Sequence, residues 1–252
     1  MRKAMMSAAA AVLMALSGSA LAAGGVEVPE REWSFEGVFG TYDRASMQRG
    51  LQIYKESCSG CHSLNLIYFR NLTDLGYTEA QAKAFAAEYE VQDGPNDEGE
   101  MYTRAANPSD RFVKPFPNDN AARAGNNGAL PPDLSLMVEA RPGGANYLYA
   151  LLTGYADAPA GTDMMEGMNY NNYFPGHQIA MAPPLSKDGI EYEDGTKATV
   201  AQQAEDIVTF LAWASEPNME ARKKMGIKVM IFLIVLTGIL IAVKKRVWAD
   251  VH

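Results

Sequence analysis

The residues with the clearest chemistry are the two cysteines of the chain, which lie in the segment Cys58-Ser59-Gly60-Cys61-His62. A C-x-x-C-H pattern is typical of c-type haem attachment, in which each thiol forms a thioether and the adjacent histidine ligates the iron. The spacing places both sulfur atoms at one edge of the porphyrin, with the imidazole pointing at its centre. The pattern therefore predicts one haem c, covalently bound through Cys58 and Cys61.

Three other readings of the same residues are weaker. A thioredoxin-like redox pair requires a strand and a βαβ unit around the motif, and no strand pattern precedes Cys58. A disulfide across two residues would be strained and would leave His62 without a role. A zinc site needs two further ligands, and only His177 and His252 remain as histidines.

The sixth ligand of the iron can come from a methionine, from His177 or from no residue at all. Outside the two apolar ends of the chain, the candidates are Met47, Met101, Met137, Met164, Met165, Met168, Met181 and Met219. Methionine is more often core filler than ligand. Met181 differs because Pro183 and Pro184 follow it and stiffen the backbone, which suits a loop that holds a weak thioether ligand. Met181 is favoured, with the alternatives open.

The composition limits the class of protein. The chain has 252 residues, of which 48% are hydrophobic and 21% are charged, values that exclude a disordered chain and a protein with many membrane spans. Two cysteines exclude a scaffold dense in disulfides. The formal net charge of −8 argues against nucleic acid as a partner, because binding to phosphates requires a surplus of Lys and Arg.

Residues 1–22 have the pattern of a cleaved secretory signal. Arg2 and Lys3 form a basic start, an apolar stretch follows, and Ala20-Leu21-Ala22 supplies small residues for cleavage. A mitochondrial transit peptide would carry arginines spread along an amphipathic stretch, which this segment lacks. We therefore expect export, with a mature chain that starts near Ala23.

Residues 222–246 are predicted to form a transmembrane anchor. The stretch 229–243 has no charge and would span about 22 Å as a helix, and about 28 Å with its neighbours if Lys228 snorkels. Three basic residues flank each side, so the positive-inside rule does not fix the orientation. The secretory signal fixes the orientation instead. Residues 23–221 are expected in the periplasm and residues 247–252 in the cytoplasm.

The exported domain 23–221 is much more acidic than the whole chain. It holds 13 Lys and Arg against 29 Asp and Glu, a net charge of −16. Such a domain attracts positively charged partners over long distances, and salt weakens that attraction. Solubility alone is the other explanation for this charge.

The patterns indicate a mostly α domain with long loops. Met47, Leu51 and Tyr54 recur at helical spacing before the cysteines, with Asp43 as the expected cap. Capping boxes at Thr78 and Thr199 predict helices over about 82–89 and 204–213, and Asn218 is expected to cap the anchor helix. Residues 91–135 are rich in Gly, Pro, Asn and Asp, which favours loops around a haem.

Further blocks surround these motifs: SFEGVFGTYD (34–43), RGLQIYKESCSGCHSL (49–64), RFVKPFPNDNAARAGNNGALPPDLS (111–135), RPGGANYLYALLTGY (141–155), NYFPGHQIAMAPPL (172–185) and ASEPNMEARKKMGIK (214–228). Together they resemble the cytochrome c1 family, the haem-bearing subunits of the cytochrome bc1 complex (quinol–cytochrome c reductase). The resemblance covers nearly all of the chain after residue 22, and it implies a cytochrome c-like haem domain.

The resemblance also implies roles for individual residues. It implies His62 and Met181 as the axial ligands of the iron. Arg141 matches an arginine near a haem propionate, and Tyr147, on a helix expected over 146–153, matches an aromatic neighbour of the haem. Pro132 matches a proline whose carbonyl orients the ligating imidazole. His177 is then an ordinary surface or haem-edge histidine.

By resemblance, the chain is an electron carrier and no enzyme on its own. It is expected in the bacterial inner membrane, in a dimeric complex with cytochrome b, where it takes an electron from the Rieske iron–sulfur protein and passes it to a basic, soluble or tethered c-type cytochrome. Two other classes stay open: a free-standing anchored cytochrome shuttle, and a haem sensor or peroxidase with an exchangeable ligand.

Overall fold

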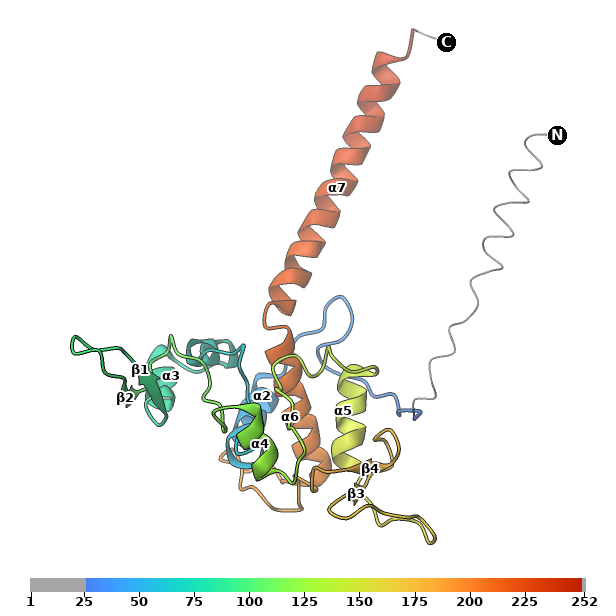
Figure 1. The fold of residues 1–252 in the computed structure, drawn as a ribbon. Helices are drawn as coiled ribbons and strands as arrows, with labels where there is room; N and C mark the ends of the chain where they lie inside the picture. The colour runs from blue at the N-terminus through green and yellow to red at the C-terminus, as the bar shows by residue number, and fades with distance from the viewer. Residues whose placement is uncertain (1–25, 251–252) are drawn as a thin grey trace, which may run out of the picture.

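The computed structural model describes residues 26–250, and this part of the chain is mostly helical. A compact group of helices and loops carries one long helix, α7, that extends away from it (Figure 1). The strands of the described residues form two small two-stranded sheets. These features confirm the predicted mostly α fold with one apolar C-terminal helix. The predicted signal, residues 1–22, lies outside the described residues.

The elements follow one another in this order: α2 (Arg44–Ile53), the π-helical turn η1 (Tyr54–Cys58), the 3₁₀ helix η2 (Phe69–Leu75), α3 (Glu79–Ala86), β1 (Glu90–Asp93), β2 (Tyr102–Ala105), α4 (Asp119–Gly125), α5 (Gly144–Thr153), β3 (Asn169–Tyr170), β4 (Gln178–Ile179), α6 (Val200–Ser215) and α7 (Met219–Val247). Both sheets are antiparallel, β1 with β2 and β3 with β4.

The core is centred on the packing of α2 against α6. Met47, Leu51 and Tyr54 are all at most 2% exposed, as their helical spacing predicts. The two helices approach closely at Gly50, where a Cβ atom would lie 2.2 Å from the backbone oxygen of Asp206. Glycine is therefore required at position 50 for this packing.

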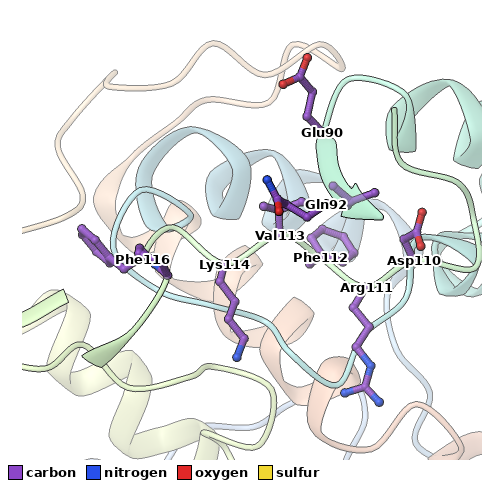
Figure 2. A pocket seen from close by; sticks show the side chains of 10 residues that line it. Glu90, Gln92, Asp110, Arg111, Phe112, Val113, Lys114 and Phe116 are labelled. Carbon is purple, nitrogen blue, oxygen red and sulfur yellow. The ribbon is translucent and has the colours of Figure 1, made fainter. Parts of the chain in front are cut away.

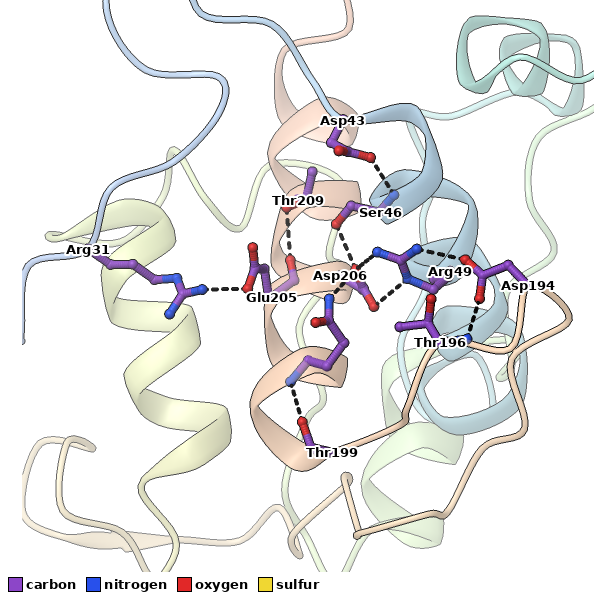
Figure 3. A network of polar contacts seen from close by, with 11 residues as sticks. Arg31, Asp43, Ser46, Arg49, Asp194, Thr196, Thr199, Glu205, Asp206 and Thr209 are labelled. Carbon is purple, nitrogen blue, oxygen red and sulfur yellow. Dashed lines mark hydrogen bonds and ion pairs between the residues drawn. The ribbon is translucent and has the colours of Figure 1, made fainter.

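A buried polar network joins the same two helices (Figure 3). Asp206 on α6 is fully buried, and its carboxylate accepts two hydrogen bonds of 2.8 Å from Arg49 and one of 2.7 Å from Ser46. Arg49 also pairs with Asp194 at 2.8 Å. Because a buried carboxylate is costly unless it is paired, this network fixes the position of α2 on α6.

The helix caps agree with the sequence patterns at two sites and differ at two. Asp43 accepts a hydrogen bond from the Ser46 backbone at 2.9 Å, and Thr78 forms a full capping box. Thr199 caps α6, but the Gln202 side chain bonds to Asp206 at 3.1 Å and leaves the box half-formed. The prediction that the Asn218 side chain caps α7 is wrong, because it makes no capping hydrogen bond.

The segment 91–135 contains more regular structure than its composition indicates. It holds most of the β1–β2 hairpin and the short helix α4. The hairpin strands lack an alternating apolar pattern. They pair in an antiparallel ladder, and Arg104 on β2 forms ion pairs with Asp93 on β1 and with Asp110 beyond the hairpin. Such pairs leave little signal in the sequence of one strand.

Helix α7 begins inside the domain and then leaves it. Met219 is 5% exposed, and Glu220 accepts hydrogen bonds from the Tyr42 backbone and from the Arg44 guanidinium, each of 3.0 Å. Beyond this first turn most apolar side chains of α7 are exposed, and the helix is long and apolar enough to cross a membrane. The predicted anchor, 222–246, therefore continues a helix that is docked on the domain.

Candidate haem site

The cysteine motif follows directly from helix α2. The last turn of this helix widens into the π-helical turn η1, where the Ser59 amide donates to the Tyr54 carbonyl at 2.8 Å. Turns of this kind are frequent at functional sites. The amide of His62 then donates to the Cys58 carbonyl at 2.9 Å. The backbone thus brings the two cysteines and the histidine into one compact turn.

The two thiols have different surroundings. Both cysteines are free of disulfides, and Cys61 is exposed whereas Cys58 is half-buried and packs against the core. Burial raises the pKa of the Cys58 thiol to about 12. One sulfur atom is therefore turned toward the interior of the domain and the other toward its edge.

The ring of His62 is held by the backbone of Pro132. Its Nδ1 atom lies 2.7 Å from the Pro132 carbonyl oxygen. Because a carbonyl can only accept, Nδ1 carries the proton and Nε2 keeps its lone pair. Burial lowers the pKa of His62, while this hydrogen bond and the charge of Asp133 act in the opposite direction. The neutral ring thus keeps the lone pair of Nε2 available to bind a metal ion.

Asp133 fixes the segment that carries the Pro132 carbonyl. Its carboxylate accepts hydrogen bonds of 2.8 Å from the Ser63 hydroxyl and the Asn65 amide, and one of 2.9 Å from the Ser135 amide. Burial opposes its ionisation, but these hydrogen bonds outweigh burial and lower the pKa of Asp133. Residues just after His62 and residues around Pro132 are thereby clamped together.

Met181 lies in a loop that is held by its backbone. The carbonyl oxygen of Met181 accepts hydrogen bonds from the Tyr155 hydroxyl at 3.0 Å and from the side-chain amide of Asn169 at 3.4 Å. The side chain is half-buried, and Pro183 and Pro184 follow it. This loop therefore has a fixed backbone from which a thioether can be presented.

Arg141 and Tyr147 lie near each other, and Tyr147 lies near Tyr155. Tyr147, on α5, is half-buried, and burial raises its pKa while the nearby charge of Arg141 lowers it. Tyr147 in turn acts on the pKa of Tyr155, which burial raises. Arg141 is exposed, and its guanidinium donates to the carbonyl of Ala140 at 3.1 Å. Tyr147 thus lies near Arg141 and near Tyr155, whose hydroxyl donates to the Met181 carbonyl, whereas a separate hydrogen bond joins His62 to Pro132.

His177 occupies a strained backbone position close to the same loop. It has a φ of 59°, which is uncommon for a residue other than glycine. Its ring stacks on Tyr170 at 5.6 Å, and its Nδ1 lies 3.1 Å from the Asn171 carbonyl. His177 is therefore placed by local contacts within the β3–β4 hairpin.

Sequence reasoning missed Asp133, Tyr155 and Asn169 as residues that hold the site. Asp133 lies in the block 111–135 and Tyr155 in the block 141–155, so membership of these blocks was the signal that could have indicated them. Asn169 lies in none of the blocks. Their roles depend on hydrogen bonds across the chain, which residue type alone does not reveal.

A separate cleft of 490 Å³ lies between β1 and the segment 110–117. Figure 2 shows Arg111 and Lys114 directed to the side opposite Glu90. The cleft is lined by none of the residues predicted to hold the haem. Its wall includes Phe112, which packs edge-on against Tyr54 at 5.8 Å, and Tyr54 donates to the His62 carbonyl at 3.1 Å. Phe112 and Tyr54 thus connect the wall of the cleft to the backbone of the cysteine turn.

Comparison with known proteins gives a consistent result. The model of the Cytochrome C1 family matches residues 33–251. A relative from Rhodospirillum rubrum named cytochrome c1 is 48% identical, over 96% of each chain. A relative from Arabidopsis thaliana named "Cytochrome c1 1, heme protein, mitochondrial" is 54% identical over 88% of this chain and 72% of its own length. A Bradyrhizobium diazoefficiens relative named "Cytochrome b/c1" is 45% identical over 99% of this chain and 39% of its own length.

Proposed function

The chain belongs to the cytochrome c1 family, and from that premise we propose that it holds one haem c through Cys58 and Cys61, with His62 and Met181 as axial ligands. The observation that carries this proposal is the 2.7 Å contact of His62 Nδ1 with the Pro132 carbonyl, which leaves Nε2 free directly after two unpaired thiols. Thiols, imidazole and thioether are a donor set that suits a c-type haem.

The residues of this chain then position the group rather than react. The Pro132 carbonyl keeps the imidazole in one tautomer and orientation, and Tyr155 and Asn169 hold the backbone of Met181. Arg141 supplies a positive charge for a propionate, beside Tyr147. A haem held by His62 and Met181 would supply one-electron transfer and would offer no open position on its iron for a substrate. No residue has to act as an acid, base or nucleophile.

We infer that the chain works as the electron-carrying subunit of a quinol–cytochrome c reductase. A relative whose name joins cytochrome b to c1 supports cytochrome b as a partner. In this proposal the electron comes from a Rieske iron–sulfur protein and leaves to a basic c-type cytochrome. The charge of −16 on residues 23–221 supports a basic acceptor, whose docking is fast and sensitive to salt. The dimeric state of the complex is part of the same proposal.

The docking of α7 supports a fixed subunit over a free-standing shuttle. A shuttle needs a flexible linker between its haem domain and its anchor. Here only residues 216–218 separate α6 from α7, and the first turn of α7 is tied to Tyr42 and Arg44. We propose that α7 crosses the bacterial inner membrane once and that the haem domain lies in the periplasm, held at a constant height above cytochrome b.

Purification through a tag on this chain tests the function. We expect cytochrome b and an iron–sulfur protein to copurify, and quinol to reduce a covalently bound haem c in the complex. Electron delivery to a basic c-type cytochrome should slow as salt increases. Tight binding of carbon monoxide to the reduced protein at neutral pH would contradict the closed coordination and favour a sensor or peroxidase.

A further inference from the structure

The loop between Trp33 and Tyr42 has a firmly anchored base. Trp33, Phe35 and Tyr42 are buried, with ring centroids 5.4 Å apart in each successive pair. The Tyr42 hydroxyl donates to the carbonyls of Ala212 and Glu216, each at 3.1 Å. The base of the loop is therefore fixed to the junction of α6 and α7.

The tip of this loop carries two exposed apolar side chains. Val38 is 63% exposed and Phe39 is 84% exposed, although Phe35 four residues before Phe39 is buried. The loop is closed by a hydrogen bond of 2.9 Å from the Thr41 amide to the Ser34 carbonyl. Gly40 is required for this closure, because a Cβ there would lie 1.9 Å from the Glu36 oxygen. The hydrogen bond and Gly40 thus hold the tip in a defined conformation that exposes Val38 and Phe39.

The loop lies against the start of α7. The Lys223 ammonium donates to the carbonyls of Phe35 at 2.6 Å and Gly40 at 3.2 Å. Figure 1 shows the blue N-terminal segment forming a loop that rises beside the first turns of α7. Val229, where the uncharged stretch begins, is six residues beyond Lys223, or about 9 Å along a helix. The loop therefore lies at the level where α7 would enter the headgroup layer.

We propose that Val38 and Phe39 insert into the interfacial layer of the bilayer, on the periplasmic side where α7 enters it. This rests on the proposed role of α7 as a membrane anchor. The loop then forms a second apolar contact beside a single helix and fixes the tilt of the haem domain on the membrane. Exposed aromatic and apolar side chains beside basic residues are typical of interfacial contacts, and Arg222 and Lys224 flank Lys223.

The far end of α7 is consistent with this placement. Trp248 follows the helix and is 55% exposed, next to the basic residues 244–246. From Lys223 to Trp248 an α-helix rises about 38 Å, slightly less than the thickness of a bilayer with its headgroups. Phe39 and Trp248 would therefore mark the two interfaces of one membrane.

Spin-label accessibility in vesicles tests the proposal. The full-length holoprotein is reconstituted into vesicles of phosphatidylcholine and phosphatidylglycerol. The Phe39→Cys variant supplies one reactive thiol, because Cys58 and Cys61 are proposed to be bonded to the haem, and this thiol carries a nitroxide label. Matched labels are placed on Ile234→Cys in the uncharged stretch and on Met165→Cys before β3, side chains that are 66% and 59% exposed. We expect the Phe39 label to lose its accessibility to a water-soluble nickel chelate while it stays accessible to oxygen.

The possible outcomes distinguish a failure of the proposed loop contact from a failure of the proposed α7 anchor. If the Phe39 label is as accessible to the nickel chelate as the Met165 label while the Ile234 label is in lipid, the loop contact is wrong and the anchor stands. A water-accessible Ile234 label would instead overturn the anchor. A Phe39 label shielded from both reagents would indicate a protein contact, which also contradicts the proposal.

Discussion

The two sides of the candidate haem site are built in different ways. Cys58 and His62 follow helix α2, which packs on α6 through buried side chains and the ion pair of Arg49 with Asp206. Met181 instead lies in the segment 154–185, whose regular structure is two strands of two residues each. There the fully buried Asn171 and the hydroxyl of Tyr155 carry much of the hydrogen bonding.

This difference separates the side of the site that is proposed to attach the haem from the side that is proposed to supply the Met181 ligand. The thiols and the imidazole follow a helix that is held on α6 by buried side chains and by the Arg49–Asp206 ion pair, so that side would present its ligands from a rigid element. The Met181 side depends on a few hydrogen bonds in loops, and regions of this kind open at a lower free-energy cost than a core. We therefore expect the bond from iron to Met181 to be lost before the domain unfolds.

The largest expected effect tests the helical side. Asp206→Ala leaves Arg49 largely buried with Asp194 as its remaining ion-pair partner, and should lower the free energy of unfolding by about 3 kcal/mol. Denaturant unfolding of the full chain in detergent, followed by circular dichroism, measures the change. Glu88→Gln breaks the exposed pair with Lys55 and serves as the control, with an expected loss under about 1 kcal/mol. Equal losses of stability in the two variants would contradict the claim that the buried Arg49–Asp206 pair holds the helical side together.

The sequence predicted the helical side better than the loop side for a physical reason. Met47, Leu51 and Tyr54 share a helical period, so their burial could be inferred from their spacing alone. The hydrogen bonds of Tyr155 and Asn169 to the Met181 carbonyl join residues 26 and 12 positions apart in loops with no period. The clamp of Asp133 on residues 63 and 65 is hidden in the same way.

A smaller effect is expected on the loop side. Tyr155→Phe removes the hydroxyl that donates to the Met181 carbonyl, at a cost of about 1 kcal/mol. That cost would shift the equilibrium between bound and free Met181 roughly fivefold without moving the unfolding transition. A pH titration of the near-infrared charge-transfer band of the sulfur–iron bond measures this equilibrium. Tyr102→Phe, at an exposed tyrosine, should leave it unchanged, and an equal shift there would refute the role of Tyr155.

The prolines after Met181 offer a weaker test of the same loop. Pro184→Ala should increase the freedom of the loop once it opens, and it should favour loss of the Met181 ligand by about 0.5 kcal/mol. The same spectral titration measures the change. Pro159→Ala, in the loop before β3, is the control and should have no effect on ligation. Stronger ligation in Pro184→Ala would show that the proline strains the loop instead of stiffening it.

The smallest effect concerns acid stability on the helical side. Hydrogen bonds from Thr196 and from Arg49 lower the pKa of Asp194 from 3.8 to about 2. A carboxyl with a lowered pKa stabilises the fold above its unfolded pKa, so this contribution is lost as the pH falls from about 4 to 2. In Asp194→Asn the stability should fall less over that range. Unfolding midpoints at several acidic pH values give the comparison, and parallel pH profiles would show that Asp194 contributes nothing.

Measuring the proposed bond between the Met181 sulfur and the iron tests the site most directly. The measurement is the near-infrared charge-transfer band, together with the reduction potential, of Met181→Leu beside the matched variant Met165→Leu, whose side chain is exposed. We predict that Met181→Leu loses the band, falls in potential and binds carbon monoxide when reduced, while Met165→Leu behaves as the unchanged protein. A Met181→Leu protein that keeps both the band and the native potential would contradict the assignment of Met181 as the sixth ligand.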